Sequence, residues 1–175
     1  AGVLLLGPRI GKYRDGKPQA IPGHSMALAF LGGMILWLGW FGFNPGSTMG
    51  ISGEAAKLVA HIVVTTNLAC AAGLIVATLL SWSVLGKPDF SMTVNGALAG
   101  LVAITPACAF VGPGGSIFVG LGAAVFCYFF VTIVKTRMGY DDSLDVFGVH
   151  GIGGAWGALA TALFIAPWAL QEGVS

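Results

Sequence analysis

Five long apolar runs separated by short polar linkers limit the folds that this sequence can adopt. They extend approximately over residues 25–43, 57–85, 91–110, 116–135 and 145–168. Each run has a length near the roughly 20 residues that cross a bilayer as a helix. A transmembrane barrel would show alternating segments of about 10 residues instead, and the sequence has none. The pattern therefore predicts an all-α fold, a polytopic transmembrane helix bundle.

The composition agrees with this fold class. Hydrophobic residues make up 56% of the chain and charged residues 9%, and the mean hydropathy is +0.88, whereas about a quarter of a soluble domain is charged. No basic cluster with interleaved aromatic residues is present, so we predict no nucleic-acid partner. The three cysteines lie inside apolar runs and are expected to pack as small apolar side chains, without disulfides.

The start of the chain is typical of the end of a helix. It begins with "AGVLLLGPRIGKY", which is apolar over residues 1–6 and has no initiator methionine. We therefore expect the end of one helix plus five full spans. Residues 1–175 are expected to form a single transmembrane domain that is incomplete.

Basic residues predict the orientation of the spans. Seven of the eight lie in alternate loops, and only Lys57 does not. The positive-inside rule places these loops in the cytoplasm. Linkers 44–54 and 111–115 and the tail 171–175 then lie outside a cell inner or plasma membrane. The seven are Arg9, Lys12, Arg14, Lys17, Lys87, Lys135 and Arg137.

Small residues recur at spacings of three and four in the last run. Such spacing lets helix backbones approach closely in lipid, so this helix is expected to lie centrally in the bundle. The residues are Gly148, Gly151, Gly153, Gly154, Gly157 and Ala158.

His150 interrupts the same run and is the main candidate for a functional residue. It follows Asp142 by eight residues, which places it roughly 12 Å into the membrane. An ionisable side chain at that depth is costly and usually faces a cavity or a partner. One interpretation is a neutral histidine that packs against another helix. The flanking glycines favour the other, a pore or proton-transfer role, while His24 and His61 are expected at the interfaces.

Polar and aromatic residues near two helix ends are further candidates. Asp145 precedes the last helix and is expected to act as an N-cap or first-turn carboxylate. In "GWFGFNPGS", residues 39–47, Phe43 would close an apolar pathway at the outer end of the first full span. Asn44 and Ser47 would offer oxygen acceptors at its mouth. The alternative for Trp40 and Phe43 is an aromatic belt at the membrane interface.

The chain lacks the motifs of the common enzyme classes. It has no HExxH, P-loop or GxSxG sequence and no cysteine–histidine cluster with metal-binding spacing. We therefore predict no enzymatic activity, no metal and no cofactor.

Three stretches resemble the ammonium transporter / methylammonium permease / Rhesus family. These are "HSMALAFLGGMILWLGWFGFNPGS", "GALAGLVAITPAC" and "DDSLDVFGVHGIGGAWGALATALF", in the family's order and spacing. The similarity covers essentially the whole chain and is closer to the microbial ammonium transporters than to the Rhesus branch.

The resemblance implies an eleven-helix fold, a homotrimer and one narrow apolar pore per subunit. This chain would correspond to the end of helix 5 through helix 10. His150 matches the second of two pore histidines, and Phe43 one of two stacked phenylalanines that gate the outer mouth. Ser47 matches a serine that helps to hold ammonium, and Leu36 and Val146 match apolar pore positions. A cytoplasmic regulator of the PII type is a further implied partner.

Ammonium or ammonia is the substrate that the resemblance implies, with methylammonium as an analogue. Moving a hydrated cation through an apolar tube is expensive, whereas neutral ammonia passes more easily. The cation would be recruited at an aromatic mouth, lose its proton, and pass the imidazole of His150. A sensor that binds the same cation without conducting it is the alternative, and the pore stretches do not separate the two.

Overall fold

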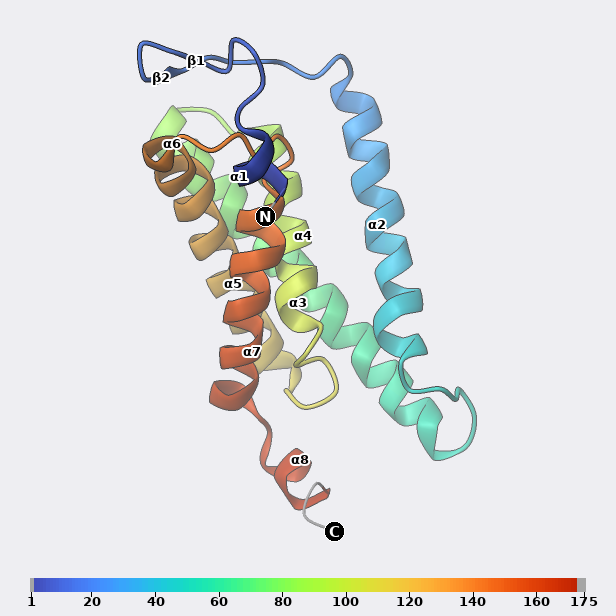
Figure 1. Cartoon of the computed structure of the whole chain (residues 1–175). Helices are drawn as coiled ribbons and strands as arrows, with labels where there is room; N and C mark the ends of the chain where they lie inside the picture. Colours follow the sequence, from blue (N-terminus) through green and yellow to red (C-terminus); the bar gives the residue numbers. More distant parts are fainter. Residues whose placement is uncertain (1, 173–175) are drawn as a thin grey trace.

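The computed structural model describes residues 2–172, which form a bundle of helices (Figure 1). Four helical segments are long and apolar enough to cross a membrane: Met26–Gly46, Glu54–Leu85, Pro113–Met138 and Phe147–Phe164. The helix Phe90–Ile104 is apolar but shorter. The predicted all-α transmembrane bundle is therefore confirmed, with a short fifth helix where a full span was expected. Part of the predicted outer tail, residues 173–175, lies outside the described residues.

The elements follow one another from α1 to α8, with one hairpin and two π-helical segments. The α-helices are α1 (Gly2–Leu6), α2 (Met26–Gly46), α3 (Glu54–Leu85), α4 (Phe90–Ile104), α5 (Pro113–Phe129), α6 (Lys135–Met138), α7 (Gly153–Phe164) and α8 (Pro167–Glu172). The strands are β1 (Tyr13–Arg14) and β2 (Lys17–Pro18), and the π-helical segments are η1 (Phe130–Val134) and η2 (Phe147–Ile152).

Prolines lie close to two helix ends. Helix α4 ends at Ile104, two residues before Pro106, and a turn follows. Thr105 keeps helical dihedral angles, with φ of −53° and ψ of −50°, but Pro106 has no N–H to donate, so the helical hydrogen-bond pattern is interrupted there. Helix α2 ends at Gly46, directly after Pro45.

Local hydrogen bonds account for several helix ends. The Ser25 hydroxyl accepts the Leu28 amide at 3.3 Å at the start of α2. The Asp89 carboxylate accepts the Met92 amide at 2.8 Å at the start of α4. Helix α3 ends at Gly86, whose φ of 72° is left-handed and therefore suits glycine. Side-chain caps and glycine thus define the ends of the apolar segments.

A short hairpin occupies part of the first polar loop. Strands β1 and β2 pair antiparallel, with Tyr13 opposite Pro18. The turn residues Asp15 and Gly16 have φ values of 50° and 72°, as a type I′ turn requires at both central positions. The Asp-Gly pair was the signal for this hairpin, and the sequence analysis treated the segment only as a loop.

Small residues bring the central helices together. A Cβ atom added at Gly100 or Gly120 would lie 2.3 or 2.2 Å from the carbonyl oxygen of Ala69 on α3. A Cβ atom at Gly157 would lie 2.3 Å from the Ala103 oxygen, so α7 and α4 are also in close contact. Close backbone approach is therefore confirmed for Gly157 in the last helix. Gly154 differs, since its nearest neighbour would be a Val102 methyl group at 3.8 Å.

The basic loops lie at one end of the bundle. Figure 1 shows β1, β2 and α6 at the same end, and α8 at the opposite end. This arrangement agrees with the alternate-loop pattern of the basic residues.

Helix α2 lies at one side of the bundle (Figure 1), and side chains join it to α3 and α4. The Trp37 indole donates to the Asn67 side chain at 3.2 Å, and the rings of Phe30 and Phe90 lie with centroids 5.8 Å apart. The buried residues of α2 are Asn44 and Pro45, both at its C-terminal end. Large side chains along the rest of the helix are exposed, including Leu28 at 57% and Ile35 at 61%. The candidate site is a cavity lined by residues of α2, of α4 and the turn after it, and of the last helical segment.

Candidate functional site

An open, mostly apolar cavity of about 720 Å³ lies between α2, α4 and the segment formed by η2 and α7. Helix α2 provides one wall and the last helix the other. The lining residues are Ile35, Leu36, Gly39, Trp40, Phe43, Val102, Thr105, Pro106, His150 and Gly154.

Three polar side chains reach this cavity, and two of them satisfy each other. The Trp40 indole donates to the Thr105 hydroxyl at 2.9 Å, and that hydroxyl donates to the Leu101 carbonyl at 2.9 Å. His150 is exposed to the cavity. Within residues 2–172, His61 is the histidine whose ring forms a hydrogen bond, at 2.9 Å from the Val111 carbonyl. The His150 ring therefore keeps both nitrogens available to a small polar molecule.

A π-helical turn carries His150. Segment η2 runs from Phe147 to Ile152, and the Gly153 amide contacts the Gly148 carbonyl, five residues earlier. Such turns are rare and frequently occur at functional sites. Because Gly148 and Val149 are buried while His150 is exposed, the turn presents the imidazole on the cavity side.

Aromatic side chains form the outer part of the cavity wall. The rings of Trp40 and Phe43 meet edge to face with centroids 6.3 Å apart, and Leu36 lies one turn before Trp40. The structure thus brings together four of the sequence-predicted site residues: Leu36, Trp40, Phe43 and His150. Their roles in conduction stay predictions.

Asn44 and Ser47, the two predicted oxygen acceptors, lie at the C-terminal end of α2 and form hydrogen bonds within the protein. Asn44 is buried and its amide donates to the Thr66 hydroxyl at 3.1 Å, so it ties α2 to α3 and offers no oxygen at the mouth. The Ser47 hydroxyl donates to the Phe43 carbonyl at 2.6 Å, within the last turn of α2. Neither lines the cavity. Both side chains satisfy polar groups near the end of the helix, which explains the difference.

Asp145 directly precedes the last helical segment, as expected, but its carboxylate does not cap that segment. Its carboxylate pairs with Lys135 and accepts from the Asn95 amide at 2.7 Å. Asp142 takes the capping role, since its carboxylate accepts the Phe147 amide at 2.7 Å. Val146 lies one turn before His150 and outside the cavity lining.

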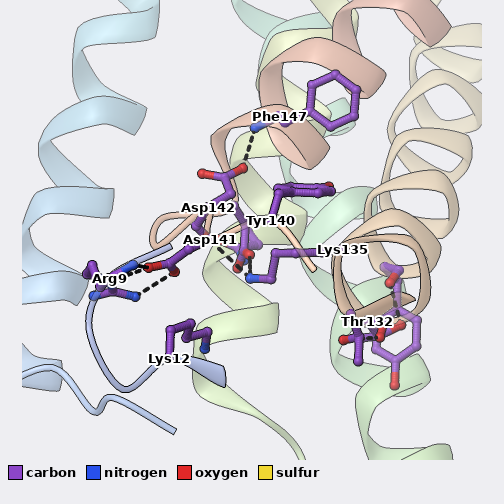
Figure 2. A network of polar contacts seen from close by, with 12 residues as sticks. Arg9, Lys12, Thr132, Lys135, Tyr140, Asp141, Asp142 and Phe147 are labelled. Atoms are coloured by element: carbon purple, nitrogen blue, oxygen red, sulfur yellow. Dashed lines mark hydrogen bonds and ion pairs between the residues drawn. The ribbon is translucent and has the colours of Figure 1, made fainter. Parts of the chain in front are cut away.

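A polar network surrounds the loop of residues 139–145, at the basic end of the molecule (Figure 2). Arg9 makes two side-chain bonds to the Asp141 carboxylate, at 2.6 and 2.9 Å, and its amide makes a third at 3.0 Å. The Tyr13 hydroxyl donates to the Tyr140 carbonyl at 3.1 Å. The first polar loop is therefore attached to the loop that precedes His150.

The network shifts the acidity of two of its members. The Arg9 guanidinium lowers the pKa of Asp141 from 3.8 to about 2, mainly through the side-chain hydrogen bonds. Partial burial, followed by the nearby carboxylates of Asp142 and Asp145, raises the pKa of Tyr140. Asp141 is therefore ionised at any physiological pH.

We expect acid to detach the first loop from the loop that contains Asp141. Because the folded-state pKa of Asp141 lies below its ordinary value, the pair stabilises this attachment fully above about pH 4 and progressively less towards about pH 2. Pepsin cleavage near Leu144, which is 77% exposed, provides the measurement. At about pH 4.5 an Arg9→Met variant should be cleaved faster than the wild type, and the two rates should converge near pH 2. Equal rates at the higher pH would contradict this expectation.

Several cavity residues escaped the sequence analysis. Ile35, Val102 and Thr105 line the cavity but lie in apolar runs without a distinguishing pattern, and Gly154 was predicted only as a packing residue. The spacing of four residues between Ile35, Gly39 and Phe43 was the available signal on α2. Among residues 2–172, no group of three or more metal-ligating side chains is gathered.

Comparisons with known proteins agree on one family. The sequence model of the Ammonium Transporter Family matches residues 1–175. The chain is 47% identical over 165 residues to the ammonium transporter Amt2 of Archaeoglobus fulgidus, covering 94% of this chain and 34% of that protein. It is 45% identical over 161 residues to the ammonium transporter of Bacillus subtilis, covering 92% and 38% respectively. The chain thus spans about a third of the length of these relatives.

Solved structures show the same relationship. A protein described as a sensor Amt protein superposes with a TM-score of 0.89 at 32% identity, over 95% of this chain and 40% of that chain. Mep2 of Candida albicans superposes with a TM-score of 0.84 at 36% identity, over 95% of this chain and 36% of that chain. With the match to the family along the whole sequence, these similarities identify the chain as part of a multi-pass membrane protein that belongs to the ammonium transporter family.

Proposed function

We propose that the protein conducts ammonium or ammonia across a membrane and that the cavity beside His150 is part of the path. The observation that carries this proposal is the imidazole itself. It is exposed in an apolar cavity whose two other polar side chains are bonded to each other. Together with membership of the ammonium transporter family, this arrangement favours a small substrate that can exchange hydrogen bonds with a histidine.

The physical course of conduction follows from the polarity of the cavity. A cation is attracted to the faces of aromatic rings, so Trp40 and Phe43 could recruit it at the outer end. A charge is costly inside an apolar path, so the substrate would transfer its proton to water at the entrance and pass as the neutral amine. The neutral amine could then accept from or donate to the His150 ring.

The proposal extends to the fold, the assembly and the regulation of the whole protein. We infer that residues 1–175 form one incomplete transmembrane domain, which corresponds to the end of helix 5 through helix 10 of the family fold. The other helices would close the side of the cavity that α2 leaves open. We further propose a homotrimer in the inner or plasma membrane with the basic loops in the cytoplasm, serving nitrogen uptake. A PII-type regulator at that cytoplasmic surface is part of the same proposal.

A sensor that binds ammonium is the second candidate. One solved structure with a TM-score of 0.89 is described as a sensor Amt protein. A conducting protein and a sensor would both bind ammonium, but only the conducting protein would move it across the membrane. Transport measurements therefore separate the two candidates.

Uptake into proteoliposomes tests the proposed function. Vesicles that contain the whole protein should take up labelled methylammonium with saturation, and ammonium should compete while tetramethylammonium should not. Protein-free vesicles are the control. Saturable binding without uptake would support the sensor, and neither binding nor uptake would contradict both candidates.

We expect changes at the outer wall to alter selectivity. Phe43→Ala should widen the cavity entrance and reduce discrimination against larger amines, because Phe43 is 60% exposed and lines the cavity. The measurement is competition of methylammonium uptake by amines of increasing size.

Phe41→Ala is the matched control for this experiment. Phe41 belongs to the same helix but packs against Trp37, with centroids 5.1 Å apart, and does not line the cavity. It should leave the selectivity unchanged. If Phe43→Ala and Phe41→Ala give the same competition profile as the wild type, the proposed entrance is in the wrong place.

A further inference from the structure

We propose that Lys135 and Asn95 are positioning residues for His150, because they hold Asp145 in the backbone conformation from which the π-helical turn starts. Neither residue lines the cavity, so the effect would pass through Asp145. The inference rests on the proposed function for its importance to transport. The part of it that concerns the turn can be tested independently.

The backbone of Asp145 is unusual. Its φ is +55°, in the left-handed region that residues with a Cβ atom rarely adopt. Aspartate tolerates this region better than most residues do, because its short side chain can form local hydrogen bonds. Here, however, the carboxylate bonds to two other elements. Contacts outside the loop therefore stabilise the conformation.

Three segments meet at the Asp145 carboxylate. Lys135 of α6 pairs with one oxygen, and Asn95 of α4 donates to the other at 2.7 Å. The Lys135 ammonium also donates to the Asp142 carbonyl at 3.1 Å. The side chains of Lys135 and Asp145 are only 19% and 14% exposed. Removal of one partner would leave the other charge poorly solvated, which makes this pair strongly coupled.

The same loop fixes the first amides of the histidine-bearing turn. The Asp145 carbonyl accepts the Val149 amide at 2.8 Å, and the Asp142 carboxylate accepts the Phe147 amide at 2.7 Å. Figure 2 shows Lys135, Asp142 and Phe147 gathered around this loop. Lys135 bonds to both Asp142 and Asp145. It therefore contacts both residues that accept the first amides of the turn.

A small change of register here would move the imidazole. Successive residues of a helix are rotated by about 100° around its axis. If the left-handed residue relaxed and the π-helical turn shifted by one position, His150 would turn out of the cavity. The proposed role is therefore to orient the imidazole towards the cavity. A salt bridge that only stabilised the fold would change the amount of folded protein but not the transport rate per folded molecule.

The test uses the whole protein in proteoliposomes and two readouts. The first is the maximal rate and the KM of methylammonium uptake, each normalised to folded protein. The second is amide hydrogen exchange of segment 146–153, followed by mass spectrometry. The variants are Lys135→Met, Lys135→Arg, Asn95→Ala, Asp145→Asn and the double variant Lys135→Met/Asp145→Asn. Lys12→Met is the control, because the Lys12 ammonium donates to the Gln19 carbonyl at 3.1 Å, within its own loop, and not to Asp145.

We expect Lys135→Met to lower the maximal rate about tenfold or more while KM changes less than about twofold, the pattern of a group that does not act in initial binding. Exchange in segment 146–153 should become faster. Lys135→Arg should restore both readouts, and Asn95→Ala should give a smaller change in the same direction. The double variant should be no worse than Lys135→Met alone, because the unpaired carboxylate is also removed. Lys12→Met should match the wild type.

Asp145→Gly and Asp145→Ala separate the backbone from the charge. Glycine adopts a positive φ without strain, so Asp145→Gly should disturb the exchange of segment 146–153 less than Asp145→Ala does. Unchanged exchange in Lys135→Met, or a normal transport rate per folded molecule, would overturn the positioning role. If the wild type transports nothing, the proposed function fails, and the exchange data alone still decide whether Lys135 and Asn95 position the turn.

Discussion

Replacement of His150 by leucine is expected to leave the protein assembled but to abolish or alter ammonium transport. Leucine has a similar size, and its apolar side chain suits a cavity that is lined by Leu36, Val102 and Phe43. The substitution removes the one polar side chain of the cavity that has no protein partner. A neutral amine would then cross this part of the path without a hydrogen bond, at the desolvation cost of an unpaired polar group, about 1–3 kcal/mol.

The measurement compares wild-type and His150→Leu protein at equal density in vesicles. Both methylammonium uptake and current should be recorded, because loss of the imidazole could change the coupling to protons as well as the rate. His61→Leu is a suitable comparison, since His61 bonds to the Val111 carbonyl and lies outside this cavity. Identical rate, selectivity and current in the wild type and His150→Leu would show that His150 only packs.

Gly157→Ala is expected to have the second large effect, on the stability of the fold. The new Cβ atom would lie 2.3 Å from the Ala103 oxygen and 2.7 Å from the Ala103 Cα atom. Both are backbone atoms, so α7 would have to move away from α4. Overpacking of this kind typically costs about 1–3 kcal/mol. Because α7 continues the segment that carries His150, the movement should also reduce transport.

Gly154→Ala provides the matched control for this substitution. It lies on the same helix, but its new Cβ atom would meet only a Val102 methyl group at 3.8 Å. Thermal unfolding in a mild detergent should show a clearly lower midpoint for Gly157→Ala than for Gly154→Ala. If the two variants unfold at the same temperature, the proposed close contact between α4 and α7 does not support the bundle.

Periodicity and apolar length were enough to predict the membrane bundle, because a run of about 20 uncharged residues has few other folds. The spans are centred where the apolar runs are, and the close approach at Gly157 followed from the spacing of small residues. The shorter α4 was missed because Ala107, Cys108 and Ala109 continue the apolar pattern after Pro106 has ended the helix. Apolar composition does not distinguish a buried turn from a helix.

The candidate site was less predictable, because it depends on which groups satisfy one another. The sequence suggested that the side-chain oxygens of Asn44 and Ser47 would be available to a ligand. In the structure Asn44 bonds to Thr66 of another helix, and Ser47 bonds to the Phe43 carbonyl at the end of its own helix. The π-helical turn and the left-handed Asp145 have no one-dimensional signature. Lys135 lies ten residues before Asp145 and Asn95 fifty residues before it, so only the fold brings them together.

Blocking the path at Leu36 tests the central claim, that the substrate passes through the cavity between α2, α4 and α7. Leu36 lines this cavity, whereas Leu38, two residues later on the same helix, does not. The native cysteines Cys70, Cys108 and Cys127 are buried and should contribute little background. A methanethiosulfonate reagent that carries an ethylammonium group should stop methylammonium uptake by Leu36→Cys protein, and ammonium should slow this inactivation. The same reagent should leave uptake by Leu38→Cys protein unchanged. Undiminished uptake by fully modified Leu36→Cys protein would contradict the proposed path.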